Sequence, residues 1–177
     1  MMSLDGYFES MDHALDWHHV DEEFNRFAAH QLSEVGTLLF GRVTYELMAS
    51  YWTSEAALTN DRTIAGYMNS LPKIVFSNSL KAASWKNSKV MNTVDVKEIQ
   101  RLRQQAEKDL ILLGSARLTS SFIRFGLINE YRIMVNPVIL GNGVPLFKET
   151  PQQLRLLQAR TFTSGNILLY YEPKELP

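Results

Sequence analysis

The sequence predicts a three-layer α/β/α protein, with a mainly parallel central sheet, helices on both of its faces and a C-terminal antiparallel β-hairpin. Over the first two-thirds of the chain, short apolar runs alternate with segments of helical spacing. The last third is strand-rich, and two of its apolar segments are joined through Thr163-Ser164-Gly165, which predicts the hairpin. Because no repeat, linker or low-complexity tract interrupts the 177 residues, we expect a single domain, 1–177.

The expected helices share a buried apolar stripe and a clear end. In the first, Asp21 to Val35, acidic residues fill the first turn, where the helix dipole favours them, and Gly36 ends the helix. Pro72 stops a later helix, and Gly126 is a C-cap. The remaining helices are expected over residues 43–51, 61–70, 96–108 and 116–125.

The expected parallel strands are short apolar runs, which are typical of strands buried on both faces. They cover residues 37–40, 73–77 and 109–113, and further strands are expected over 131–135, continuing into 136–140, and over 154–162 and 166–171. Met1 to Gly6 is interpreted as the end of a strand and the turn after it. Because a strand usually has ~5 residues, either this first strand is very short or the natural chain begins upstream.

Composition and charge exclude several functions. The formal net charge is −1 and Lys and Arg do not cluster, so we expect neither a nucleic acid nor a membrane surface as a partner. The chain has no cysteine, which excludes disulfides and Cys-based metal sites, and the histidines have no ligand spacing, so we expect no metal. No secretory signal and no apolar stretch of ~20 residues is present. We therefore expect a cytoplasmic location.

Three polar segments directly follow the expected parallel strands. In an open α/β sheet, ligands bind at the carboxyl ends of the strands, where helix N-termini present their N–H groups. Each segment alone is also consistent with an ordinary turn or helix cap, and for the second segment a solvated turn is the favoured interpretation. Together they predict a dinucleotide site. They are Gly41-Arg42-Val43-Thr44, Ser77-Asn78-Ser79 and Gly114-Ser115-Ala116-Arg117-Leu118.

These segments, with three others in the same order, resemble the dihydrofolate reductase superfamily. The similarity is greatest to bacterial proteins that resemble the reductase domain of the bifunctional riboflavin-biosynthesis deaminase/reductase, and it extends from Ser3 to about Pro173. The resemblance implies an eight-stranded sheet, NADPH as the hydride donor, and a homodimer. In this resemblance the polar segment at Gly41 is longer and extends from Phe40 to Glu46. The three other segments that carry the resemblance are Ser3-Leu4-Asp5-Gly6, Leu15-Asp16-Trp17 and Pro137-Val138-Ile139-Leu140-Gly141-Asn142-Gly143.

The resemblance also implies which residues bind the cofactor. Arg42 and Thr44 match the element that handles the cofactor phosphates. Relatives commonly carry Arg where Asn78 stands, and Asn78 cannot neutralise a 2′-phosphate, so the choice between NADPH and NADH stays open. The residues expected to bind the cofactor are Gly41, Arg42, Thr44, Ser77, Asn78, Ser79, Gly114, Ser115, Ala116, Arg117 and Leu118.

The substrate side is expected to combine three rings with an acid. Trp17, Phe40 and Tyr45 are the candidate substrate contacts, and Asp5 and Glu23 are the candidate catalytic acids. Helical phase favours Glu23, whereas the spacing from Trp17 favours Glu22, and both could equally be solvated first-turn acids. Asp5 could equally be a turn residue that bonds its own backbone. A proton would come from Asp5, Glu23 or water.

The expected function is an NADPH-dependent reductase that passes a hydride to a C=N or C=O carbon of a small planar heterocycle. One alternative is a riboflavin-pathway reductase of the 5-amino-6-ribosylaminouracil type, acting on a ribosylated aminopyrimidine. Another is a non-catalytic nucleotide-binding dimer with the same fold. Sequence does not decide among them, because the fold and the cofactor site do not fix the substrate.

Overall fold

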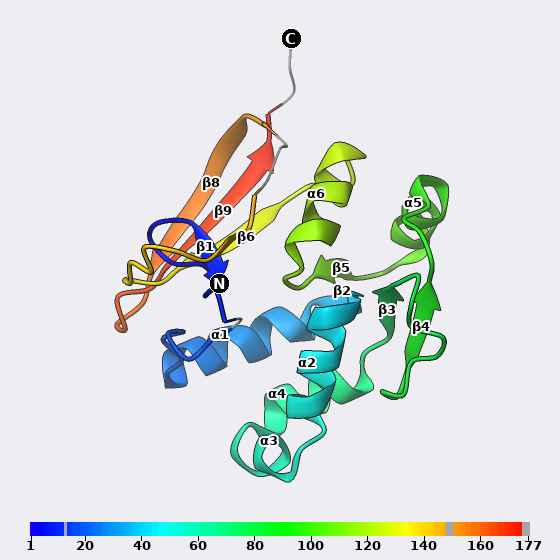
Figure 1. Ribbon diagram of the computed structural model, residues 1–177, viewed down its shortest axis with the longest axis horizontal. Helices are drawn as coiled ribbons and strands as arrows, with labels where there is room; N and C mark the ends of the chain where they lie inside the picture. The colour runs from blue at the N-terminus through cyan, green and yellow to red at the C-terminus, as the bar shows by residue number, and fades with distance from the viewer. Residues whose placement is uncertain (13, 148–150, 175–177) are drawn as a thin grey trace. The chain divides into compact units, whose positions relative to one another are not determined.

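The computed structural model describes residues 1–12, 14–147 and 151–174, which form two compact units (Figure 1). The first unit comprises Met1–Phe24 and Thr119–Pro177, and the second comprises Asn25–Leu118. The mixed α/β class that the sequence predicts is confirmed, whereas the single domain stays a prediction. Within the described residues, no helix is both long and apolar enough to cross a lipid bilayer.

The second unit is built on a parallel sheet with strand order β4-β3-β2-β5. Gly41 of β2 pairs with Phe76 of β3, and Leu39 of β2 pairs with Leu112 of β5. Because the strands are parallel, the carboxyl ends of β2, β3 and β5 lie at one edge of the sheet. β4 was not predicted, because its sequence SKVM has too few apolar residues to stand out. The bounds are β2 Val35–Gly41, β3 Lys73–Phe76, β4 Ser88–Met91 and β5 Asp109–Leu112.

The five predicted helices are present, and several begin at side-chain caps. The predicted ends of two are wrong, because Val35 and Gly36 belong to β2 and α5 ends at Gln105. Asp21 accepts a hydrogen bond from the Phe24 amide at 2.7 Å, and Asp95 caps its helix in the same way. α3 was not predicted because six residues are too few to show helical periodicity. The bounds are α1 Glu22–Ser33, α2 Arg42–Trp52, α3 Glu55–Asn60, α4 Arg62–Ser70, α5 Val96–Gln105 and α6 Ala116–Arg124.

The core of the second unit lies between β2, β3 and helices α1, α2 and α4. Its centre is a group of aromatic rings, in which Phe40, Tyr45 and Trp85 lie 6.0 to 6.5 Å apart between centroids. Lys73 is 1% exposed, and its ammonium lies 4.5 Å from the centre of the Trp85 ring. Three backbone carbonyls accept its protons, those of Asn69, Leu71 and Lys86.

The first unit contains an antiparallel sheet with strand order β6-β9-β8. The predicted hairpin between β8 and β9 is confirmed, and the Phe162 amide donates to the Asn166 carbonyl at 2.9 Å across its turn. The predicted continuation of β6 through 136–140 is wrong. Pro137 has no N–H, and the Val138 amide turns back to the Asn136 carbonyl at 2.8 Å. The bounds are β6 Tyr131–Val135, β8 Leu154–Thr161 and β9 Ile167–Pro173.

A third, two-stranded sheet joins β1 (Tyr7–Glu9) to β7 (Val144–Pro145) in the first unit. Beside it, Met2 forms an isolated parallel bridge with Val135 of β6. The described strands therefore pair within three sheets, where the resemblance implied a single sheet of eight strands. β1 and β7 are too short to have shown a period-two pattern in the sequence.

Candidate functional site

The carboxyl ends of β2 and β5 approach each other closely at Gly41 and Ser115. A Cβ atom on Gly41 would lie 2.2 Å from Oγ and 3.0 Å from Cβ of Ser115. A side chain at position 41 would therefore require the Ser115 hydroxyl to rotate and the turn after β5 to shift, so the close approach favours glycine here. Gly41 has φ −78° and ψ 160°, which any residue adopts. The sequence pattern placed these two residues at neighbouring strand ends, and the structure brings them into contact.

The turn after β5 has an unusual backbone that also faces α2. Gly114 and Ser115 have φ of +63° and +61°, the left-handed region that is uncommon for a non-glycine residue such as serine. A Cβ on Gly114 would lie 3.3 Å from Cγ2 and 3.5 Å from Oγ1 of Thr44. Residues held in such sparsely populated backbone conformations cluster at functional sites, so this turn is a candidate ligand contact. We name Gly41, Thr44, Gly114 and Ser115 the cradle.

Two helices begin at the cradle with unneutralised N-termini. α2 begins at Arg42, directly after Gly41, and α6 begins at Ala116, directly after Ser115. Neither helix has an acidic residue in its first turn, and Gly41 provides no side-chain cap to α2. The first turns of α1, α3 and α5 do contain acids, whereas α4 also lacks one. Because the partial positive charge at a helix N-terminus favours an anion, two such helix starts at one place favour a phosphate group at the cradle.

The other predicted cofactor residues of this unit surround the cradle. Arg42 is exposed and its guanidinium is 2.8 Å from the Glu46 carboxylate. This ion pair was not predicted, although the i,i+4 spacing of Arg42 and Glu46 in the sequence was a signal for it. Arg117 is exposed at the start of α6, whereas Leu118 is 7% exposed, and its Cβ would lie 4.0 Å from a Cβ added to Gly41.

The segment after β3 is held by one buried hydroxyl. Ser77 is 8% exposed, and its Oγ accepts hydrogen bonds from the amides of Ser79 and Leu80 at 3.2 and 2.9 Å. The side chains of Asn78 and Ser79 are exposed. Because Gly41 pairs with Phe76, this segment directly adjoins the start of α2. Ser77 therefore shapes the turn, its Oγ also lies 3.4 Å from that of Ser79, and the exposed Asn78 side chain can face a ligand.

In the first unit, Asp5 fastens two turns together. Its carboxylate accepts hydrogen bonds from the Ser3 hydroxyl at 2.7 Å and from the amides of Gly141 and Leu140 at 2.8 and 3.2 Å. The bond from Ser3 is the largest cause that lowers the pKa of Asp5 below its ordinary value, and the two amides lower it further. Asp5 is therefore ionised at neutral pH.

Glu23 anchors the β8–β9 hairpin. Its carboxylate accepts hydrogen bonds from the Thr163 amide and hydroxyl, both at 2.9 Å, and from the Arg160 guanidinium at 3.2 Å. The amide bond from Thr163, then its hydroxyl and then Arg160, lower the pKa of Glu23. A role for either acid in proton transfer stays a prediction, and Glu22 is exposed on the same helix turn.

The three predicted substrate-contact rings differ in accessibility. Phe40 is 0% and Tyr45 is 2% exposed, and both lie in the core of the second unit. The Tyr45 hydroxyl accepts a hydrogen bond from the Trp85 amide at 2.8 Å. Trp17 belongs to the first unit and is half-buried, and its indole N–H donates to the Ala14 carbonyl at 3.2 Å. We keep only Trp17 as a candidate substrate contact, because core rings do not reach a ligand.

A family model described as the RibD C-terminal domain matches residues 1–169. The chain belongs to this family. The uncharacterized protein YyaP of Bacillus subtilis (strain 168) is 30% identical to it over 174 residues, which cover 96% of this chain and 90% of that protein.

Solved structures share the fold of this RibD C-terminal domain at low sequence identity. RibD from Acinetobacter baumannii has a TM-score of 0.70 and 16% identity, over 98% of this chain and 56% of that chain. Dihydrofolate reductase from Enterococcus faecalis, solved in a complex with NADP(H), has a TM-score of 0.65 and 15% identity, over 98% and 93% of the two chains. These likenesses confirm the dihydrofolate reductase-like fold that the sequence analysis expected.

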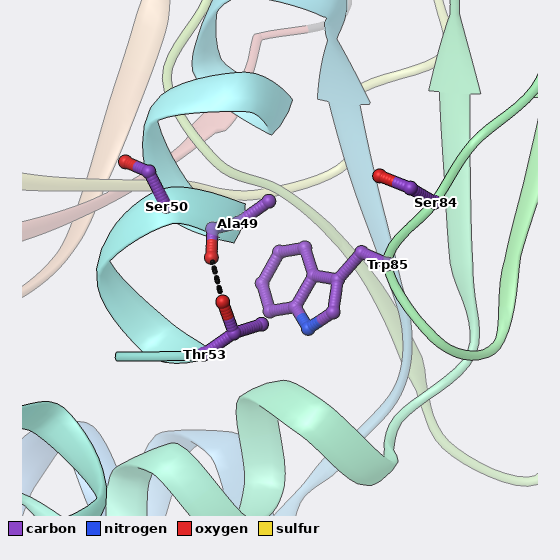
Figure 2. Close-up of a pocket in the computed structure, with 5 residues that line it drawn as sticks. All are labelled: Ala49, Ser50, Thr53, Ser84 and Trp85. Carbon is purple, nitrogen blue, oxygen red and sulfur yellow. Dashed lines mark hydrogen bonds between the residues drawn. The ribbon is translucent and has the colours of Figure 1, made fainter. Parts of the chain in front are cut away.

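The second unit of this RibD C-terminal domain also has a cavity of about 280 Å³, away from the cradle (Figure 2). Ala49, Ser50 and Thr53 near the end of α2 line it with Ser84 and Trp85. α2 has 11 residues, so its two ends are about 16 Å apart at the helical rise. The Thr53 hydroxyl donates to the Ala49 carbonyl at 2.8 Å, and only 5% of Trp85 is exposed. The cavity therefore offers little ring surface to a ligand.

Proposed function

We propose that this RibD C-terminal domain is a reductase that binds NADPH through the cradle. The protein would pass a hydride to a C=N or C=O carbon of a small planar heterocycle of the pterin or aminopyrimidine type. The observation that carries the proposal is the close approach of Gly41 and Ser115 at the starts of two helices that lack first-turn acids. Such an arrangement suits a pyrophosphate, because backbone amides and helix dipoles converge where a side chain has no room.

Each cofactor residue then has a distinct task in the proposal. The amides at the starts of α2 and α6 would bind the pyrophosphate, and Thr44 and Ser115 would add hydroxyl groups. Arg42 would neutralise phosphate charge, and to do so it would break its exposed ion pair with Glu46. Loss of that pair costs little stability, because exposed ion pairs contribute at most about 1 kcal/mol. Asn78 and Ser79 would hydrogen bond the adenosine ribose.

The cofactor supplies the hydride when it is bound. The chain itself contributes by holding two rings in contact and by excluding water between them, which lowers the barrier through proximity. Because hydrogen bonds lower the pKa of both Asp5 and Glu23, both carboxylates are poor proton donors at neutral pH. We propose that water delivers the proton, and that Asp5 has a structural role, in which it joins the turn at Ser3 to the turn at Gly141.

Family membership favours an aminopyrimidine of the riboflavin pathway as the substrate class. The similarity to Acinetobacter baumannii RibD supports this second candidate through the shared fold alone. A ribosylated aminopyrimidine such as 5-amino-6-ribosylaminouracil is therefore included in the test beside dihydropterins and quinonoid pterins.

The test is a titration of the full chain with NADPH and with NADH, followed by tryptophan fluorescence, and then a turnover assay with the substrate panel. We expect saturable NADPH binding and loss of NADPH absorbance with at least one substrate. Binding without turnover of any substrate would favour the non-catalytic nucleotide-binding dimer. Absence of binding to both dinucleotides would overturn the proposed function.

A further inference from the structure

The loop that carries Trp17 is shaped by hydrogen bonds within itself. The Ser10 hydroxyl oxygen accepts a hydrogen bond from the Ala14 amide at 2.9 Å, and the Ala14 carbonyl accepts one from the indole N–H of Trp17 at 3.2 Å. The His18 amide donates to the Leu15 carbonyl at 3.1 Å. These bonds join the loop to itself, so the place of its end depends on the contacts of the next residue.

Two asparagine side chains hold the end of this loop at His19. Oδ1 of Asn136 accepts a hydrogen bond from the His19 amide at 2.9 Å, and Nδ2 of Asn166 donates one to the His19 carbonyl at 2.8 Å. Asn136 directly follows β6, and Asn166 directly precedes β9. Both backbone polar groups of one residue are thus bonded to the antiparallel sheet, which fixes the direction of its two peptide planes. We name Asn136 and Asn166 the clamp.

Both clamp residues are completely buried, which is costly for an amide side chain. Each is 0% exposed, and a buried polar group costs free energy unless it is hydrogen-bonded. Nδ2 of Asn136 makes a second bond, to the Met2 carbonyl at 3.3 Å. Oδ1 of Asn166 has no hydrogen-bond partner among the residues that the structure describes. An apolar side chain at position 166 would avoid that unpaired oxygen, so the contribution of Asn166 is its donor to His19.

His19 is two positions from Trp17, and the residue between them packs against the Trp17 ring. The rings of Trp17 and His18 lie 4.3 Å apart between centroids, edge to face. Burial lowers the pKa of His18 from 6.5 to about 4, so its ring is neutral at neutral pH. The neutral ring contacts the Trp17 ring, and the clamp holds the backbone that follows. A displacement of His19 would therefore be transmitted to Trp17.

We propose that Asn136 and Asn166 are positioning residues for the substrate, which act by holding the Trp17 ring in place against the heterocycle. The inference rests on the proposed function, in which Trp17 is the candidate substrate contact. The cradle belongs to the second unit, whereas the clamp and Trp17 belong to the first. The clamp should therefore affect the heterocycle and not the dinucleotide. Because a misplacement of ~1 Å can cost about 10²-fold in rate, a displaced ring should reduce turnover in a protein that stays folded.

The test compares Asn136→Ala and Asn166→Ala with Leu127→Ala in the full chain. Leu127 is 5% exposed in the first unit, so its truncation lowers stability and leaves the clamp intact. For both clamp variants we expect kcat/KM for the heterocycle to fall at least about tenfold, with NADPH affinity within about twofold of the wild type. Leu127→Ala should keep the wild-type kcat/KM and NADPH affinity at a temperature where all variants are folded.

A spectroscopic measurement tests the clamp without turnover. The chain has three tryptophans, and fluorotryptophan labelling gives each a fluorine NMR signal, with that of Trp17 assigned by Trp17→Phe. We expect the clamp variants to move the Trp17 signal, whereas those of Trp52 and Trp85, in the second unit, stay in place. In the wild type, the His19 amide should exchange slowly with solvent, and this measurement stands even if an Asn→Ala variant does not fold.

Wild-type turnover with unchanged kcat/KM in both clamp variants would overturn the inference and leave the proposed function standing. So would clamp variants that lose NADPH affinity as much as kcat/KM, an unmoved Trp17 signal, or a wild-type His19 amide that exchanges as fast as an unbonded one. A wild type that turns over no substrate of the panel would overturn the proposed function, and the inference with it.

Discussion

Replacing Gly41 by Ala tests the cradle directly. The added Cβ would lie 2.2 Å from the Ser115 hydroxyl oxygen and 3.0 Å from its Cβ. Rotation of the hydroxyl relieves the first contact but not the second, so the turn after β5 has to move. Overpacking of this kind costs about 1–3 kcal/mol, and reduced freedom of the unfolded chain returns roughly 0.4–1 kcal/mol. We expect a net loss of about 1–2 kcal/mol in unfolding free energy.

For a chain of this size, 1 kcal/mol corresponds to roughly 2–4 °C in Tm, so the expected decrease is about 2–8 °C. The control is Gly66→Ala in α4, where a Cβ meets nothing within 4 Å. Because alanine is the better helix former, we expect this control to be neutral or stabilised by about 1 kcal/mol. Thermal and urea unfolding of both variants measure the difference.

The double variant Gly41→Ala with Ser115→Gly separates crowding from other causes. Ser115→Gly removes both clashing atoms and relieves the φ of +61°. We expect it to restore the stability that Gly41→Ala loses. NADPH affinity of Gly41→Ala should fall at least about tenfold, which corresponds to about 1.4 kcal/mol. A Gly41→Ala protein with the stability and NADPH affinity of Gly66→Ala would refute the reasoning.

Three further predictions concern groups outside the cradle. Tyr45→Phe leaves the buried Trp85 amide without an acceptor, so urea unfolding should show a loss of about 1–3 kcal/mol; unchanged stability would contradict the structural role given to Tyr45. Because hydrogen bonds from Thr163 lower the pKa of Glu23, its stabilising effect is present above its unfolded pKa and is lost as pH falls through the folded value. The Tm difference between wild type and Glu23→Gln should therefore disappear on acidification, and a difference that grows would contradict this. Burial lowers the pKa of Lys73 from 10.5 to about 8, so the stability of the wild type relative to Lys73→Met should rise between about pH 8 and 10.5, as measured by urea unfolding across that range.

Local patterns in the sequence were sufficient for the strands that end at the cradle. The runs before Gly41 and Gly114 are short and apolar, and a buried parallel strand is the structure they favour. The polar residues that follow them mark the carboxyl ends, where ligands bind. The hairpin turn at 163–165 was likewise predicted from adjacent residues alone.

Contacts between residues that are distant in the sequence could not be predicted from these local patterns. Glu23 meets Thr163 across 140 positions, and no local period reveals such a partner. Phe40 and Tyr45 stand next to the cradle segment in the sequence, and a motif does not distinguish a ring that faces the core from one that faces a ligand. The close contact of Gly41 with Ser115 also depends on how two separate strands are paired.

The most direct test of the central claim is an amide NMR titration of the full chain with NADPH. If the dinucleotide phosphates bind at the starts of α2 and α6, the largest shifts should occur at residues 41–44 and 114–117, and the Leu58 amide should not move. Inorganic pyrophosphate should shift the same amides more weakly. Saturable NADPH binding that leaves both segments unshifted would contradict the account.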